Sequence, residues 1–151
     1  MASGSEAEIR LREITEETVR SVLQLEVSEN QKNFVAPNAV SIAQAYFSQT
    51  AWFRAIYAND TPVGFVMLHV DEDKPEYYVW RLMVDKDQQG QGYGHKAMLL
   101  VIEHVRSLPG AKELYLSYVP AEGNPVPFYR KFGFVETGEW EDDEKVMKLI
   151  L

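Results

Sequence analysis

Three glycines alternate in the stretch 84–95, which has the sequence VDKDQQGQGYGH. The stretch follows an apolar run and precedes a helical pattern, so it predicts a strand, a loop and the start of a helix. Glycine lets the backbone approach a ligand closely and adopt positive φ. Free N–H groups at a helix N-terminus, with the positive end of the helix dipole, attract an anion. The stretch therefore predicts a site for a phosphate-like group, although a glycine-rich turn without a ligand has the same composition.

Two common nucleotide-binding motifs do not fit this stretch. A Walker loop ends in Gly-Lys-Ser/Thr, whereas Gly94 is followed by His95, Lys96 and Ala97. A Rossmann fingerprint would need its third glycine at position 95, which is a histidine. The spacing that remains is Gln89-x-x-Gly92-x-Gly94.

The 151 residues carry a formal net charge of −8 and no cysteine. The length suits one domain, which we expect over residues 6–151 after a flexible start at 1–5. The negative charge argues against a nucleic-acid partner, because neutralising phosphates requires clustered Lys and Arg, and it leaves a cationic substrate open. The absence of cysteine excludes disulfides and is compatible with a cytoplasmic location. No apolar run approaches the ~18 residues of a membrane span and no signal peptide is visible, so we expect no membrane partner.

Hydrophobic periodicity predicts the elements that position the glycine loop. Strands are expected on both sides of the loop, with a helix between them that ends near Pro109. Strands in this order are parallel neighbours with a right-handed crossover. Thr15 and Ser41 are predicted N-caps of two earlier helices, the second carrying Ile42, Ala45, Tyr46 and Phe47. The expected α/β domain has a mixed sheet with strands at 9–12, 51–57, 63–70, 76–84, 113–119, from 134, and at 145–151, and a short helix at 126–131.

The spacing Gln89-x-x-Gly92-x-Gly94 resembles the acetyl-CoA signature of the GCN5-related N-acetyltransferases, the GNAT family. A second motif, Tyr129-x-x-x-Gly133-Phe134, resembles another segment of that family and follows in the same order. The resemblance implies a GNAT fold: a single mixed, mostly antiparallel sheet whose central parallel strands splay apart, flanked by about four helices. The stretches 33–38, 80–85 and 137–139 are similar to bacterial spermidine/spermine (diamine) acetyltransferases.

The resemblance also implies a site that binds acetyl-CoA as co-substrate and holds no metal. In the family the glycine loop binds the pyrophosphate through backbone amides, and the pantetheine arm enters between the splayed strands. Tyr129 is the matching position for a general acid that protonates the leaving thiolate, although a core tyrosine is the alternative. A backbone N–H near Met83 or Val84 is expected to bind the acetyl oxygen, and we assign Met83 a catalytic role. The predicted cofactor contacts are Leu82, Met83, Val84, Gln89, Gly90, Gln91, Gly92, Tyr93, Gly94, His95, Asn124, Tyr129 and Lys131. Asn124 is equally compatible with capping the helix that follows it.

The acceptor amine is expected among carboxylates and aromatic rings, which suit a polycation. The predicted substrate-binding residues are Glu26, Glu29, Phe34, Tyr78 and Trp80. The acidic run 139–144 lies in the same region of the family's fold, although a solvated turn is the commoner explanation for such a run. A base must take the amine's proton, and Glu26, Glu29, Glu72 and Glu76 all remain open. His69, His95 and His104 show no metal-ligand spacing, and His104 is expected on a solvated helix face.

The leading functional hypothesis is acetyl-CoA-dependent N-acetylation of a polyamine such as spermidine or spermine. The alternatives are acetylation of a protein, peptide or aminoglycoside amine and, from another class, a CoA-binding sensor without turnover. The expected partner is a small-molecule amine, and a homodimer is compatible with the sequence.

Overall fold

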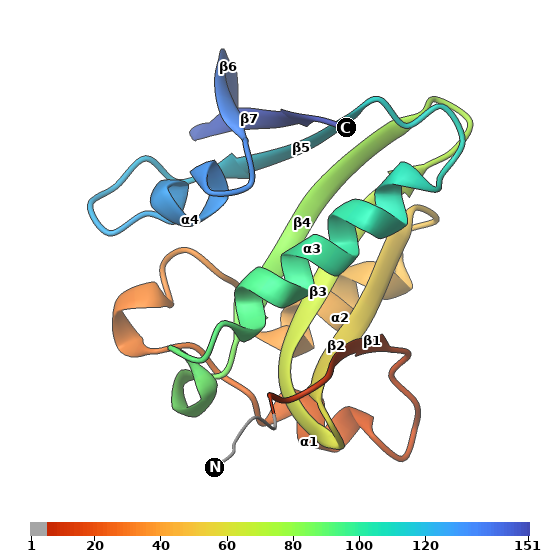
Figure 1. The fold of residues 1–151 in the computed structure, drawn as a ribbon, viewed down its shortest axis with the longest axis vertical. Coiled ribbons are helices and arrows are strands. Elements are labelled where there is room, and N and C mark those ends of the chain that lie inside the picture. Colours follow the sequence, from red (N-terminus) through yellow and green to blue (C-terminus); the bar gives the residue numbers. More distant parts are fainter. Residues whose placement is uncertain (1–5) are drawn as a thin grey trace.

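The computed structural model describes residues 6–151, so the predicted flexible start at 1–5 lies outside the described residues. One sheet contains seven strands of the described chain in the order β1-β2-β3-β4-β5-β7-β6 (Figure 1). Every neighbouring pair is antiparallel except β4 and β5, which are parallel. The strands are β1 (Ile9–Arg12), β2 (Ala51–Ala58), β3 (Thr61–Asp71), β4 (Glu76–Val84), β5 (Glu113–Tyr118), β6 (Val135–Glu141) and β7 (Glu144–Ile150).

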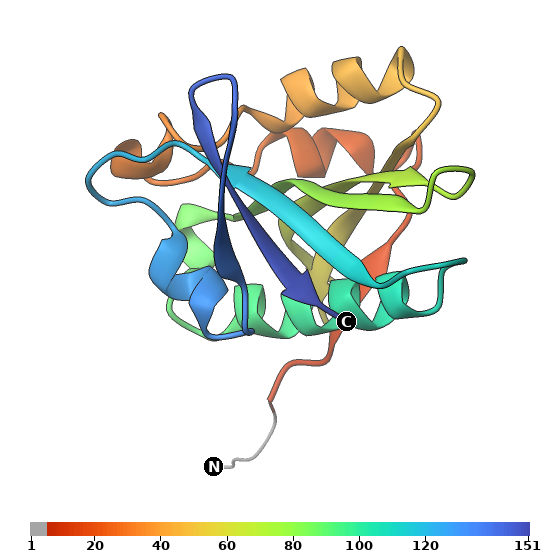
Figure 2. The same ribbon diagram turned by 90° about the horizontal axis from the view of Figure 1, so that it is seen from above.

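The helices lie in two layers on opposite faces of the sheet. Figure 2 shows α1 (Val19–Leu23) and α2 (Asn38–Tyr46) on one face, with α3 (Tyr93–Arg106) and α4 (Val126–Arg130) on the other. Two short 3₁₀ turns, η1 (Glu29–Gln31) and η2 (Lys86–Gln88), complete the described helical elements. The mixed sheet with these flanking helices confirms the predicted fold class.

Helix α3 is the crossover between the two parallel strands. Its apolar residues recur at helical spacing and are buried against the sheet, as the periodicity predicted: Ala97, Met98, Val101, Ile102 and Val105. Alternate residues of β4 and β5, such as Tyr77, Val79, Leu114 and Leu116, join the same core cluster. A second, smaller cluster on the other face includes Val22 of α1, Phe65 of β3 and Met83 of β4. Both faces of the central strands are therefore buried, which explains their nearly continuous apolar sequence.

The two parallel strands pair over a very short length and then separate. Their only register partners are Tyr78 with Tyr115 and Val79 with Leu116. Directly after this contact β4 contains a bulge, because Val79 lies opposite Leu68 while Arg81 lies opposite Met67, leaving Trp80 as an extra residue. A bulge bends its strand and disrupts pairing. The predicted splay between the central strands is therefore present, and it begins at Trp80.

Two predicted helix caps are wrong. Residues 16–18 form a turn after Thr15 and α1 begins at Val19, so Thr15 is not its N-cap. Helix α2 begins at Asn38, and Ser41 lies buried inside it instead of capping it. At Thr15 a local turn overrides the capping preference of the residue, and at Ser41 burial in the fold overrides it. Tyr46 and Phe47, both predicted in α2, are the last residue and the C-cap of that helix, and they are 83% and 86% exposed. No helix within residues 6–151 is long and apolar enough to span a bilayer.

Candidate active site

A cleft of about 1380 Å³ occupies the opening between β4 and β5. Its walls include the chain around 31–36, the glycine loop, the start of α3, α4 with the loop leading into it, and residues of β3 and of the β6–β7 hairpin. In Figure 1 the glycine loop and α4 lie near the same end of α3, and Figure 2 shows the segment around 31–36 on the α1 and α2 side of the sheet, opposite α4. The cleft therefore reaches both faces of the sheet through the point where the strands separate.

The glycine loop has the backbone conformation that the sequence predicted. Gly90 and Gly92 have φ of +84° and +80°, which L side chains rarely adopt, and a Cβ at either position would project into open space. Gly92 is the N-cap of α3. The first bond of the helical ladder runs from the Lys96 N–H to the Gly92 carbonyl at 3.1 Å, so the N–H groups of residues 93–95 precede the ladder. Together with the helix dipole they form an anion-binding end with room beside it.

Gly94 differs from Gly90 and Gly92, because it lies inside α3. A Cβ on Gly94 would lie 3.4 Å from Val84 Cγ2 and 3.7 Å from the Phe128 ring. These are ordinary van der Waals distances, so the first turn of α3 packs against the end of β4 and α4 without requiring glycine at this position.

The end of β4 directs a defined set of backbone groups into the cleft. In an antiparallel ladder, residues whose N–H and C=O bond to the neighbouring strand alternate with residues whose groups point away. The Asp85 N–H donates to the Val63 carbonyl at 2.7 Å, so Asp85 and Met83 direct their backbone groups toward β3. Leu82 and Val84 direct theirs toward β5, from which β4 has already separated. The N–H of Met83, predicted as the catalytic donor, is thus used in the sheet, whereas those of Leu82 and Val84 face the cleft.

Tyr129 lines the cleft from α4. Its ring packs edge-on against Phe128 and Phe134, at centroid distances of 5.4 and 5.9 Å. Desolvation in this apolar setting raises the pKa of the Tyr129 hydroxyl to about 12. The hydroxyl makes no hydrogen bond within residues 6–151, so it is a neutral donor available to a ligand.

Three further predicted cofactor residues lie along the same wall. Asn124 lines the cleft, but its side chain accepts from the Val126 N–H at 3.0 Å and donates to the Ala121 carbonyl at 2.9 Å. These bonds favour the structural alternative, in which Asn124 orders the turn before α4. His95 stacks on Phe132 at 4.8 Å, and Lys131 lines the cleft nearby.

The bulge shapes the opposite, acceptor side of the cleft. Because Trp80 is an extra residue, Trp80 and Arg81 both turn toward the α2 face: Trp80 packs on the cluster there, and Arg81 donates to the Gln44 side chain at 3.1 Å. Tyr78, His69 and Phe34 line the same side. Burial lowers the pKa of Arg81, and the negative charge of Glu144 acts in the opposite direction.

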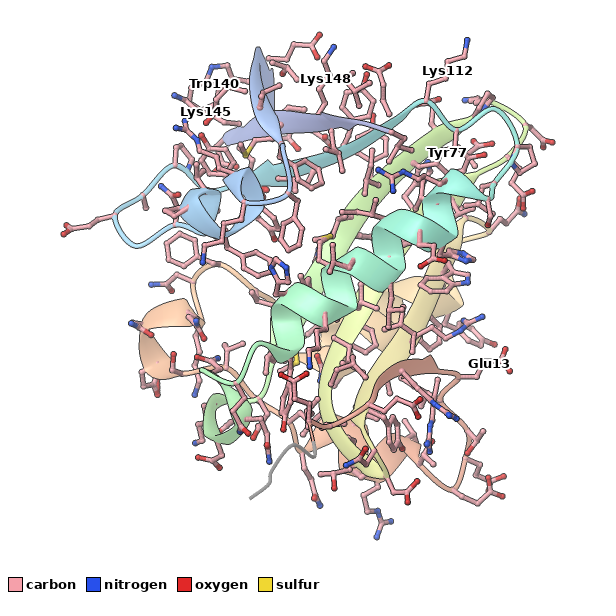
Figure 3. All side chains as sticks on the ribbon, viewed as in Figure 1. Glu13, Tyr77, Lys112, Trp140, Lys145 and Lys148 are labelled. Carbon is pink, nitrogen blue, oxygen red and sulfur yellow. The ribbon has the colours of Figure 1, made fainter. Side chains whose placement is uncertain are left out.

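Two carboxylates at the tip of the β6–β7 hairpin also line this side. Glu141 and Glu144 are direct register partners and both lie on the cleft wall. The Ser117 hydroxyl on β5 donates to Glu144 Oε1 at 2.9 Å. Neither carboxylate forms an ion pair with another residue in the described part of the chain. Like charges directly opposite in a sheet are unfavourable, and a bound cation relieves them. Figure 3 shows Trp140 and Lys145 at this hairpin, with the Lys145 ammonium 5.4 Å from the Trp140 ring centroid.

Several predicted residues are not part of the cleft. Glu26 forms an ion pair with Lys86 at 2.6 Å, which lowers the Glu26 pKa first through the hydrogen bond, and Glu29 pairs with Lys32 at 3.2 Å. Glu72 and Glu76 lie at the β3–β4 turn, and Gln91 points to the Tyr93 hydroxyl at 3.1 Å outside the lining. His104 is not on a solvated face: its ring stacks on Trp52 at 4.4 Å and its Nε2 is buried.

Sequence reasoning missed Ser117 and Arg81, and it left Glu141 and Glu144 open between the acceptor pocket and a solvated turn. Their shared wall depends on the β6–β7 register and on the bulge at Trp80. A two-residue turn at Asp142 and Asp143 makes Glu141 and Glu144 direct cross-strand partners on one face of the hairpin, and this turn is the signal that could have placed them together.

The splayed strands, the glycine loop at a helix N-terminus and the cleft between them define an acyl-CoA-dependent transferase. The model of the Acetyltransferase (GNAT) family matches residues 13–134, and the chain belongs to this family. It is an N-acetyltransferase.

Relatives and solved structures agree with this assignment. The chain is 30% identical over 148 residues to the spermine/spermidine N(1)-acetyltransferase of Bacillus subtilis (strain 168), covering 92% of this chain and 96% of the relative. It is 29% identical over 106 residues to the peptidyl-lysine N-acetyltransferase YjaB of Escherichia coli (strain K12), covering 68% and 62% of the two chains. Its fold matches the spermidine N-acetyltransferase from Vibrio cholerae, solved with CoA and spermine, with a TM-score of 0.75, 15% identity, and coverage of 94% and 95%.

Proposed function

We propose that the protein transfers the acetyl group of acetyl-CoA to a primary amine of a polyamine such as spermidine or spermine. The observation that carries the proposal is the Glu141–Glu144 pair, two carboxylates on the acceptor wall that form no ion pair among residues 6–151. A polyamine supplies the missing positive charge while its methylene groups lie against Trp80 and Phe34. The names of the Bacillus and Vibrio proteins point to the same substrate class.

The cofactor side of the cleft fits acetyl-CoA. The positive φ of Gly90 and Gly92 and the free N–H groups at the start of α3 suit a pyrophosphate. The pantetheine arm carries amide groups, and the backbone groups of Leu82 and Val84 are oriented to bond with them as a further strand would.

The acetyl oxygen becomes more negative as the amine attacks, so it requires a fixed donor. We assign this role to the N–H of Leu82 or Val84 in place of Met83, because only these two face the opening. The Val84 carbonyl already accepts from the Gln89 side chain at 3.0 Å, which fixes this end of β4. The Tyr129 hydroxyl donates a hydrogen bond to the departing sulfur.

A substrate panel tests the proposal. CoA release is followed with spermidine, spermine, putrescine, an aminoglycoside and lysine-containing peptides at equal concentrations. Polyamines are expected to give the highest kcat/KM, and Glu141→Gln is expected to raise the polyamine KM through loss of one charge. Asp143→Asn removes a charge from the same hairpin outside the cleft lining and serves as the matched control.

The similarity to a peptidyl-lysine acetyltransferase supports a second candidate acceptor, a lysine side chain in a protein. Lysine also presents an ammonium on an alkyl chain, so the same carboxylates suit it. Turnover of peptides alone in the panel would replace the polyamine with this candidate. Binding of CoA without turnover of any amine would instead favour a sensor.

A further inference from the structure

Amine acetylation requires a group that takes the proton which nitrogen loses as the C–N bond forms. The four glutamates considered from the sequence lie outside the cleft lining. Glu144, the first residue of β7, lies on the lining and is half-buried.

The position of Glu144 follows from the sheet register. On β5, Leu116 is the last residue paired with β4, so Ser117 is the first residue beyond the contact between the two strands. Ser117 lies opposite Val146 on β7, two residues after Glu144, so all three share one face. The Ser117 hydroxyl holds Glu144 Oε1 at 2.9 Å and leaves Oε2 free to receive another donor. Across the opening, the N–H of Leu82 faces the same gap from β4.

We propose that the Glu144 carboxylate accepts the proton of the attacking amine. The nitrogen binds to the acetyl carbon and loses one proton to Glu144, while the C–S bond breaks. Glu144 returns this proton to solvent, and the released thiolate, held by the Tyr129 hydroxyl, takes one proton from solvent. The proposal rests on amine acetylation in the proposed function, but it does not depend on which amine is the acceptor.

The charged and titratable groups around Glu144 come from four strands. They are Arg81 and Tyr78 on β4, Tyr115 on β5, Glu139 and Glu141 on β6, and His69 on β3. Arg81 partly offsets the negative charge of Glu144, and its positive charge opposes binding of the amine in its protonated form.

His69 is the competing base, because it also lines the cleft. It lies opposite Tyr78, at the level where β4 and β5 are still paired, and its Nδ1 is 2.8 Å from the Thr50 hydroxyl. Glu144 is favoured over His69 because Ser117 holds it beyond that pairing, at the opening itself.

The experiment compares Glu144→Gln, His69→Gln and Asp143→Asn in the full chain, with whichever amine the wild-type protein acetylates fastest. Glu144→Gln keeps an oxygen for the Ser117 bond, and we expect kcat to fall about 10²- to 10⁴-fold. We expect acetyl-CoA affinity by calorimetry to stay unchanged, and amine affinity, measured in the presence of CoA, to weaken. Formate added to Glu144→Ala should restore part of the lost rate, because a free carboxylate then fills the vacated space. Asp143→Asn should keep the wild-type kcat.

Several outcomes would overturn the proposal. A normal kcat with only a raised amine KM in Glu144→Gln would leave Glu144 as a binding residue. A lowered kcat in His69→Gln together with a normal kcat in Glu144→Gln would assign the role of base to His69 on β3. Acetylation of peptides but not polyamines by the wild-type protein would contradict the substrate assignment alone, since Glu144 is then tested with the peptide. Failure of the wild-type protein to acetylate any amine would overturn both the proposed function and the role of Glu144 as the base.

Discussion

Replacing Tyr129 with phenylalanine removes the one hydroxyl that α4 directs at the cleft. With a pKa of about 12, this phenol is a poor acid toward a thiolate whose conjugate thiol has a pKa of roughly 8.5. The pKa gap of about 3.5 corresponds to roughly 5 kcal/mol against full transfer of the proton. The hydroxyl therefore acts mainly as a hydrogen-bond donor to the developing negative charge.

A hydrogen bond to a charged group contributes about 1.5–3 kcal/mol, so Tyr129→Phe should lower kcat about 10- to 150-fold. Acetyl-CoA affinity, measured by calorimetry, should change far less than kcat. The matched control is Tyr77→Phe, which deletes a hydroxyl that donates to the Pro109 carbonyl at 2.5 Å, near the far end of α3 (Figure 3). That variant should lose stability and keep its kcat.

The raised pKa of Tyr129 also determines the direction in which kcat changes with pH. Tyr129 stays protonated below about pH 11, so its ionisation should not reduce kcat in that range, and the rate should instead rise as more of the amine becomes neutral. An unchanged kcat in Tyr129→Phe would refute the assignment. So would a loss of activity near pH 9 that is absent from the phenylalanine variant.

Three further substitutions test the supporting structure. Gly92→Ala forces φ of +80° on an L residue, which costs about 1–2 kcal/mol, and should weaken acetyl-CoA binding in calorimetry; equal affinity would contradict the loop assignment. Gly64→Ala would place a Cβ 2.3 Å from the Met83 carbonyl oxygen, so the free energy of unfolding should fall by about 1–3 kcal/mol and the melting temperature with it. An unchanged melting temperature would show that β3 and β4 can move apart at no cost. Asn38→Ala removes the 3.0 Å bond from Asn38 Nδ2 to the Val22 carbonyl, which still accepts from the Leu25 N–H at 3.2 Å, so urea unfolding should show a loss of about 0.5–1.5 kcal/mol.

Strong local patterns made much of this fold predictable from sequence. β4 has the predicted bounds, Glu76–Val84, and α3 begins directly after Gly92 because the loop needs two positive φ angles there. Short helices were harder. Asn38 uses its side chain to bond α1, so tertiary contacts, and not a cap at Ser41, decide where α2 starts.

The assignment of individual site residues depended on which of the alternating residues of a strand face the cleft, and the sequence does not reveal this alternation. β4 is apolar and aromatic on both faces, so nothing in its pattern marks Trp80 as an extra residue. That one residue reverses which of the following amides point at β5, and it is why Leu82 and Val84 face the cleft while Met83 does not. The same limitation hid the Glu141–Glu144 pair, because membership of one wall requires the register of β6 with β7.

The opening between β4 and β5 amounts to a pair of strand edges inside the sheet. Other proteins protect such edges with charges or a covering helix. In the function proposed above, the amide-bearing arm of the co-substrate takes the place of the absent strand. The bound molecule thereby becomes part of the architecture, and folding stability is linked to its concentration. Acetyl-CoA at 100 times its dissociation constant adds about 2.7 kcal/mol to the free energy of unfolding. The resistance of the protein to unfolding consequently follows the supply of the cofactor that it consumes.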